Sequence, residues 1–309
     1  MSMRPAITTS KATPTMEGAG VHLHRAFGFN SPQTHDPFLL FDDFRNNNPK
    51  SYLAGFPWHP HRGIETITYV LSGSVAHSDS LGNSGTLTNG DVQWMTAGSG
   101  IMHQEMPTGN TRGQMHGFQL WANLPGHLKM TTPRYQDVQS KDISEIIDDD
   151  GTKVKVITGN FWGKKGPVDG IAADPLYLDI NVPANRRKSF KVDTYRNTFA
   201  YIFEGEGKFA DASTPKGILL EKEMLGQELN IRDMSGDRTL VQFGTGNDIV
   251  VQAGQQGIRF LLIAGAPIQE PIAWHGPIVM NTQEELRTAI NDLRNNRFVK
   301  PQQQSTIKP

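Results

Sequence analysis

The 309-residue sequence predicts an all-β protein in which one β unit, a sandwich or a barrel, occurs twice. Short runs rich in valine, isoleucine, threonine and aromatic residues alternate with Gly, Asn-Gly and Pro turns, which is typical of antiparallel β architectures. The runs at 69–75 (YVLSGSV) and 118–126 (FQLWANLPG) also have later echoes at 201–209 (YIFEGEGKF) and 260–268 (FLLIAGAPI). Such echoes are expected of a duplicated unit.

The predicted strands are short and each closes at a turn residue. They combine β-branched and aromatic residues over the lengths that strands usually have, roughly four to eight residues. The strand-like runs are 66–73, 85–98, 116–126, 152–161, 176–183, 198–209 and 258–267.

The length of the chain favours two domains, each able to bury its own core. The most polar interior stretch, 137–153, is predicted to cross between them. We therefore expect an N-terminal domain at 1–138 and a C-terminal domain at 139–309.

Helix is expected only near the C-terminus, at about 282–297. Thr282 and Glu285 have the spacing of a capping box, which marks a helix start. Three apolar residues then recur at helical spacing on one face: Leu286, Ile290 and Leu293.

Composition excludes several classes of function. Lysine plus arginine (30) nearly balances aspartate plus glutamate (31), so the chain has no electrostatic footprint for direct nucleic-acid or anionic-membrane binding. The N-terminus lacks the apolar core of a signal peptide and no long apolar run occurs, so a cytoplasmic location is expected. With no cysteine, any bound metal must use nitrogen and oxygen ligands.

The stretch WHPHRGIETITYVLSG (58–73) contains the first candidate ligands. His59 and His61 are two residues apart, so in a strand both side chains point to the same face, as would Glu65 if the strand stays regular. An isolated pair of this kind is more often found on a surface than on a metal. Glu65 could be a ligand, orient an imidazole, or pair with Arg62.

The stretch MTAGSGIMHQEMP (95–107) repeats the pattern with His103 and Glu105, after a turn that contains Gly98 and Gly100. Three imidazoles and a carboxylate from two antiparallel strands would bind a divalent first-row metal and leave positions open for water or substrate. Together the two motifs favour a metal site, while His77 and His116 are weaker candidates.

Five segments together resemble the pirin family of the cupin superfamily, in order and from about residue 20 to 295. They are DPFLLFDDF (36–44), HPHRGIETITYVLSG (59–73), GDVQWMTAGSGIMHQEMP (90–107), HGFQLWANLP (116–125) and HGPIVMNTQEEL (275–286).

The resemblance implies two tandem cupin barrels, which are double-stranded β-helices of the jelly-roll type. It also implies one divalent metal ion per chain, iron(II) before other first-row metals, bound only in the N-terminal barrel. By the family's motif the ligands would be His59, His61, His103 and Glu105, whereas many other cupins take their glutamate from the position of Glu65.

The C-terminal copy cannot repeat this site. No histidine occurs between His127 and His275, and superposing the echoes places Lys191 and Asp193 where His59 and His61 stand. We expect a structural role for this copy.

Two functions follow from the resemblance. The first is a quercetin 2,3-dioxygenase-like enzyme that opens a small aromatic, flavonol-like substrate with O2 and releases carbon monoxide, with Glu105 or Glu65 as catalytic base. The alternative is a metal-dependent, redox-sensing binding protein whose partner is a transcription factor or a metabolic enzyme. Three neutral imidazoles and one carboxylate leave iron(II) net positive, which would stabilise a substrate oxyanion and favours the enzyme.

Overall fold

The computed structural model describes residues 2–29, 33–169, 172–210 and 234–300. The chain forms two compact units, and each is assembled from two segments. One unit comprises residues 14–140 and 268–309 and contains all ten histidines, so we call it the histidine unit. The other comprises residues 1–13 and 141–267 and is called the histidine-free unit.

The composition of the two units differs from the simple division into 1–138 and 139–309. The crossing lies close to the expected place, between residues 140 and 141. However, each end of the chain belongs to the unit that contains the other half of the sequence. The N-terminal strand β1 (Ala6–Lys11) pairs antiparallel with β21 (Thr239–Phe243) of the histidine-free unit. The C-terminal segment from residue 268 onward belongs to the histidine unit.

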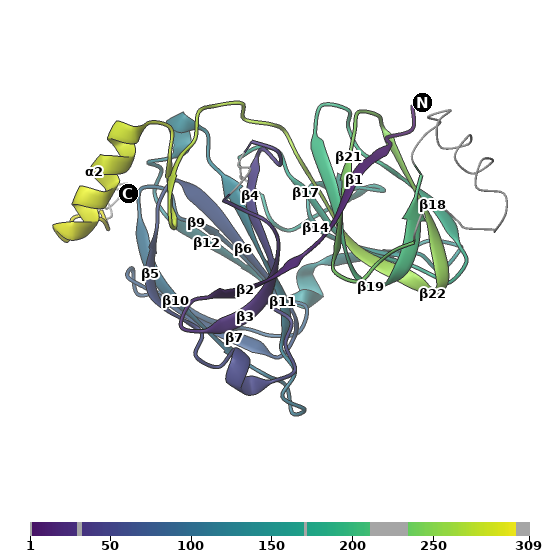
Figure 1. The fold of residues 1–309 in the computed structure, drawn as a ribbon, viewed down its shortest axis with the longest axis horizontal. Helices are drawn as coiled ribbons and strands as arrows, with labels where there is room; N and C mark the ends of the chain where they lie inside the picture. Colours follow the sequence, from purple (N-terminus) through teal and green to yellow (C-terminus); the bar gives the residue numbers. More distant parts are fainter. Residues whose placement is uncertain (1, 30–32, 170–171, 211–233, 301–309) are drawn as a thin grey trace, which may run out of the picture. The chain divides into compact units, whose positions relative to one another are not determined.

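The histidine unit contains two main antiparallel sheets (Figure 1). The larger has the strand order β12-β9-β6-β11-β4-β3-β2 and the smaller the order β5-β10-β7-β8. The larger sheet consists of β2 (Thr13–Glu17), β3 (Val21–Phe27), β4 (Phe38–Asp43), β6 (Ile64–Ser72), β9 (Val92–Thr96), β11 (His116–Asn123) and β12 (Arg134–Val138). The smaller consists of β5 (Phe56–His61), β7 (Ser74–Asp79), β8 (Ser84–Leu87) and β10 (Ile101–Thr108).

Strand β6 lies between β9 and β11 in the middle of its sheet, and its residues from Ile64 to Val70 are buried on both faces. Its β-branched and aromatic residues suit this position, since such side chains pack well against cross-strand neighbours. Short 3₁₀ turns occur at η1 (Pro49–Ser51), η2 (Gly126–Leu128) and η3 (Ser140–Asp142).

The histidine-free unit is built on one large sheet with the path β1-β21-β19-β22-β17-β14-β13, to which β18 and β20 add by pairing with β22 and β19. Its apolar core includes Val156, Leu178, Phe190, Ile202 and Phe260. The remaining strands are β13 (Ser144–Ile147), β14 (Lys153–Thr158), β15 (Asn160–Phe161), β16 (Lys164–Lys165), β17 (Leu176–Val182), β18 (Arg187–Lys191), β19 (Asn197–Phe209), β20 (Ser235–Gly236) and β22 (Asp248–Gly265).

The sequence echoes correspond to equivalent strand pairs. Strand β6 contains the beginning of the first echoed run and pairs with β11, which contains most of the second, so that Tyr69 lies opposite Phe118. In the other unit the corresponding runs lie in β19 and β22, where Tyr201 lies opposite Leu261. The prediction of a duplicated all-β unit is confirmed.

Helix α2 (Gln283–Arg294) follows the hairpin of β23 (Ala273–His275) and β24 (Ile278–Met280) in the histidine unit (Figure 1, yellow). The predicted capping box is present, because the Thr282 side chain accepts from the Glu285 backbone and the Glu285 side chain accepts from the Thr282 backbone. Leu286 and Ala289 are buried in a cluster that includes Phe298. Among the described residues, no helix is long and apolar enough to span a bilayer.

A buried lysine attaches this C-terminal segment to the rest of the unit. Lys129 donates from Nζ to the carbonyls of Gly63 (2.9 Å) and Val279 (3.0 Å) and to Asn123 Oδ1 (2.7 Å). Gly63 has a φ of 76°, and a Cβ there would lie 1.9 Å from the Val279 carbonyl oxygen. Glycine is therefore required where β24 crosses the turn that follows His61.

Candidate functional site

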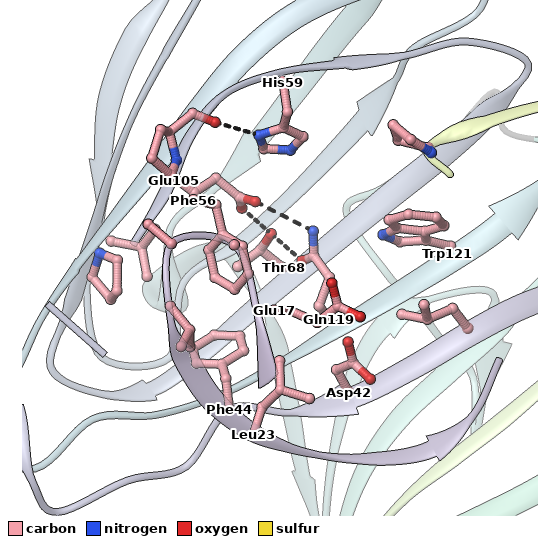
Figure 2. Close-up of a pocket in the computed structure, with 18 of the residues that line it drawn as sticks. Glu17, Leu23, Asp42, Phe44, Phe56, His59, Thr68, Glu105, Gln119 and Trp121 are labelled. Carbon is pink, nitrogen blue, oxygen red and sulfur yellow. Dashed lines mark hydrogen bonds between the residues drawn. The ribbon is translucent and has the colours of Figure 1, made fainter. Parts of the chain in front are cut away.

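A cavity of about 430 Å³ opens within the histidine unit. Its volume lies in the range usual for small-molecule sites. Most of its wall is apolar or aromatic, and a few polar side chains interrupt it (Figure 2). The apolar and aromatic lining includes Val21, Leu23, Phe29, Leu40, Phe44, Phe56, Trp58, Val75 and Trp121.

The two histidine motifs lie on neighbouring antiparallel strands, β5 and β10. His103 is directly opposite His59, and Ile101 is opposite His61. The register then shifts, so that Glu105 pairs with Phe56 and β5 contains one extra residue. Such a bulge re-aims the side chains around it. The expectation that the motifs meet across two antiparallel strands is confirmed.

The three imidazoles converge. One ring nitrogen from each of His59, His61 and His103 lies within 4.8 Å of the others. The Nε2 atoms of His59 and His61 are 3.1 Å apart. Two nitrogens bound to one first-row metal at about 2.1 Å and at a right angle would lie about 3 Å apart, so this spacing suits a shared ion.

The protonation of the cluster also suits a metal. Burial lowers the pKa of all three imidazoles, and the neighbouring rings lower those of His61 and His103 further, so the neutral forms are favoured. His59 Nδ1 lies 2.8 Å from the Pro57 carbonyl oxygen, which can only accept. The Nδ1 atom therefore carries the proton, and the Nε2 lone pair faces the cluster.

His103 shows that the cluster needs a partner. Both of its ring nitrogens are buried and make no hydrogen bond within the described structure. A buried unsatisfied nitrogen costs about 1–3 kcal/mol, which coordination to a metal would offset. The histidines therefore fit a divalent cation with nitrogen ligands.

Glu105 faces the same cavity but is held by other groups (Figure 2). Its Oε1 accepts from the Thr68 hydroxyl at 3.0 Å, and its Oε2 lies 3.5 Å from Gln119 Nε2. Burial raises the pKa of Glu105 to about 7. Its carboxylate does not belong to the three-histidine group. The sequence motif and the cavity bring Glu105 close to the histidines, and Thr68 and Gln119 set its orientation.

Glu65 lies elsewhere, contrary to the expectation that it shares a face with His61. That expectation assumed a regular strand, but the chain turns at Gly63 and β6 belongs to the other sheet. Thr68 faces the cavity, and residues three apart in a strand point to opposite faces, so Glu65 points away. Its Oε1 accepts from the Thr96 hydroxyl at 2.6 Å.

A family model described as Pirin matches residues 20–122, and one described as Pirin C-terminal cupin domain matches residues 177–299. The chain belongs to the pirin family. The double cupin fold expected from the sequence motifs is thereby confirmed, and the first matched region contains both histidine motifs.

Individual pirin relatives are similar over nearly the whole chain. A pirin-like protein of Caulobacter vibrioides is 41% identical over 96% of this chain and 100% of its own length. A Pseudomonas aeruginosa protein provisionally named a quercetin 2,3-dioxygenase is 39% identical over 91% of this chain and 93% of its own. The crystal structure of a quercetin 2,3-dioxygenase from Acinetobacter baumannii matches with a TM-score of 0.82 at 30% identity, covering 96% of this chain and 99% of that one.

In the described part of the second cupin of this pirin-family chain, no comparable cluster occurs. Lys191 ends strand β18 and is exposed, and Asp193 is also exposed, so the two positions superposed on His59 and His61 do not form a buried site. Of the weaker candidates, His77 is opposite Glu105 in the β7–β10 pairing, and His116 contacts the ring of Phe118. Neither belongs to the three-histidine group.

Sequence reasoning missed the polar residues that accompany the histidines in the pirin cavity. Thr68, Gln119, Asp42 and Arg25 all line it, each from a different strand of the larger sheet. A signal was available, since the first three interrupt apolar runs (TITYVL, GFQLW and FLLFDD). Polar residues within buried strands need a partner or a ligand.

Proposed function

We propose that this protein is an iron-dependent dioxygenase of the quercetin 2,3-dioxygenase type. The observation that supports it best is the convergence of three neutral imidazoles, two of which line a mostly apolar cavity. A flat aromatic substrate suits such a cavity, because the apolar lining binds the rings while a few polar groups orient them.

The proposed metal would be held by His59, His61 and His103. Iron(II) there would act as a Lewis acid toward the 3-oxygen of a flavonol and bring O2 and the electron-rich ring together. The overall reaction consumes one flavonol and one O2 and yields a ring-opened ester and one carbon monoxide.

The chain's own groups have three tasks in this proposal. Trp121 and Phe56 contribute apolar wall that excludes water from the reacting ring. Glu105 would accept the proton of the 3-hydroxyl, because it lies two residues after His103 in β10, on the same face of the strand, and lines the cavity. Thr68 and Gln119 hold that carboxylate in place.

The test is turnover by the iron-loaded protein under air. We expect loss of the quercetin absorption band, uptake of O2 and release of carbon monoxide in equal amounts. A flavone without the 3-hydroxyl should not react, and His103→Ala should abolish the reaction. Iron-loaded protein that binds metal through the three histidines yet consumes no O2 with any flavonol would refute the enzyme and favour a metal-dependent regulatory protein.

A further inference from the structure

Besides the histidines, a cluster of three charged side chains from β2, β3 and β4 lines the cavity. Arg25 donates from Nε and Nη2 to the two carboxylate oxygens of Asp42 at 2.8 and 2.7 Å, and from Nη1 to Glu17 Oε1 at 2.8 Å. All three side chains line the cavity. We call Glu17, Arg25 and Asp42 the carboxylate pole, and the three histidines the histidine pole.

A polar route connects the two poles. Glu105 lies 3.5 Å from Gln119, and Gln119 on β11 is directly opposite Asp42 on β4. Side chains at directly opposed positions of an antiparallel pair are neighbours on the same face. In Figure 2, Gln119 lies between the Glu105 carboxylate on one side and Asp42 and Glu17 on the other.

An aromatic route connects them along the same wall. The ring of His61 contacts Trp121 edge-on at a centroid distance of 5.1 Å, and Trp121 contacts Phe29 at 6.4 Å. The Arg25 guanidinium lies 5.2 Å from the centre of the Phe29 ring. A planar ligand at the histidine pole that follows this wall therefore reaches the carboxylate pole.

The charge of the carboxylate pole determines what it can bind. Two carboxylates face one guanidinium, and the hydrogen bonds to Asp42 and Glu17 occupy three nitrogens of Arg25. The carboxylate oxygens retain lone pairs beyond those contacts, because an ionised carboxylate has about four acceptor sites. The pole should bind hydroxyl donors and disfavour anionic groups.

We propose that the carboxylate pole makes this site specific for polyhydroxylated flavonols. Glu17 and Asp42 accept hydrogen bonds from ring hydroxyls distant from the oxygen held at the histidine pole. This inference rests on the proposed function, because it takes a flavonol as the occupant. It adds a specificity determinant that neither histidine motif contains.

The experiment is an anaerobic binding titration of iron-loaded protein, which separates binding from turnover. The probes are quercetin and 3-hydroxyflavone, which share the 3-hydroxyl and 4-carbonyl and differ only in the other hydroxyls. We expect the wild-type protein to prefer quercetin. Glu17→Gln and Asp42→Asn should each weaken quercetin binding about tenfold, the usual effect of a charge-assisted hydrogen bond, and leave 3-hydroxyflavone binding unchanged.

Glu145→Gln, an exposed carboxylate in the histidine-free unit, is the charge-matched control and should not change the preference. If Asp42→Asn does not fold, Glu17→Gln decides the question. An unchanged preference in the folded variants would overturn the inference, even if quercetin is turned over. If the variants lose the preference for quercetin while the wild-type protein releases no carbon monoxide under air, the inference is supported and only the proposed enzyme is refuted.

Discussion

The Arg62 guanidinium, which is next in sequence to His61, donates to the Asp292 carboxylate of α2 at 3.0 Å. It also donates to the Phe298 carbonyl at 2.8 Å and lies 4.2 Å from the centre of the Phe298 ring. Arg62 is almost fully buried. The C-terminal segment is thus anchored to the strand that presents two of the three histidines.

Arg62→Met should destabilise the protein by about 2 kcal/mol. The change removes the cation–π contact and the buried hydrogen bond to Phe298, while Asp292 keeps Lys300 as a partner at 2.8 Å. Urea unfolding gives the free energy. Arg294→Met, which changes an exposed arginine of α2, is the matched control, and equal effects of the two changes would show that the anchor contributes nothing.

Local patterns predicted the parts of the fold that depend on nearby residues. The capping box of Thr282 and Glu285 spans four residues, and the spacing of His59 and His61 follows from the alternation of a strand. The glycine turn before His103 was also predicted, and Gly98 and Gly100 have φ values of 48° and 132°. Each of these features is determined by short-range geometry.

Features set by long-range pairing could not be predicted in this way. Strand β1 pairs with β21, more than 200 residues later, and no local signal specifies that partner. The face of Glu65 depended on whether the strand continued through Gly63. Asp42 and Gln119 are neighbours because of the register between β4 and β11, and the alternation within each strand does not determine that register.

Metal analysis should return one ion per chain. His59→Ala, His61→Ala and His103→Ala each remove an imidazole from the cluster and should strip most of the metal. His127→Ala, an exposed histidine of the same unit, should keep it. Two ions per chain, or full occupancy in His103→Ala, would contradict the assignment.

Removing the charge of Glu105 and removing that of Glu65 should affect metal binding differently. Glu105→Gln alters a carboxylate in the cavity beside the histidines and should weaken metal binding about tenfold or more. Glu65→Gln alters a carboxylate on the opposite face of β6, where Thr96 can still donate to the amide oxygen, so metal content should survive. Competition with a chelator measures both affinities, and equal losses would place Glu65 at the metal.

The pH dependence of the unfolding free energy should reveal the protonation of Asp42. Burial raises its pKa from 3.8 to about 6; Arg25 opposes this shift, and the negative charges of Glu17 and Asp43 add to it. Between these two values the folded protein binds more protons than the unfolded chain, so the Asp42 contribution is fully present below pH 3.8 and is lost as the pH rises through 6.

The variant Asp42→Asn has no carboxyl group at this position to titrate. The wild-type free energy of unfolding minus that of the variant should therefore fall by roughly 2 kcal/mol between pH 4 and pH 7. Urea unfolding of both proteins across this range measures the difference, in which the pH dependence of the shared histidine cluster cancels. A constant difference would show that Asp42 is ionised throughout and that Arg25 outweighs the effect of burial.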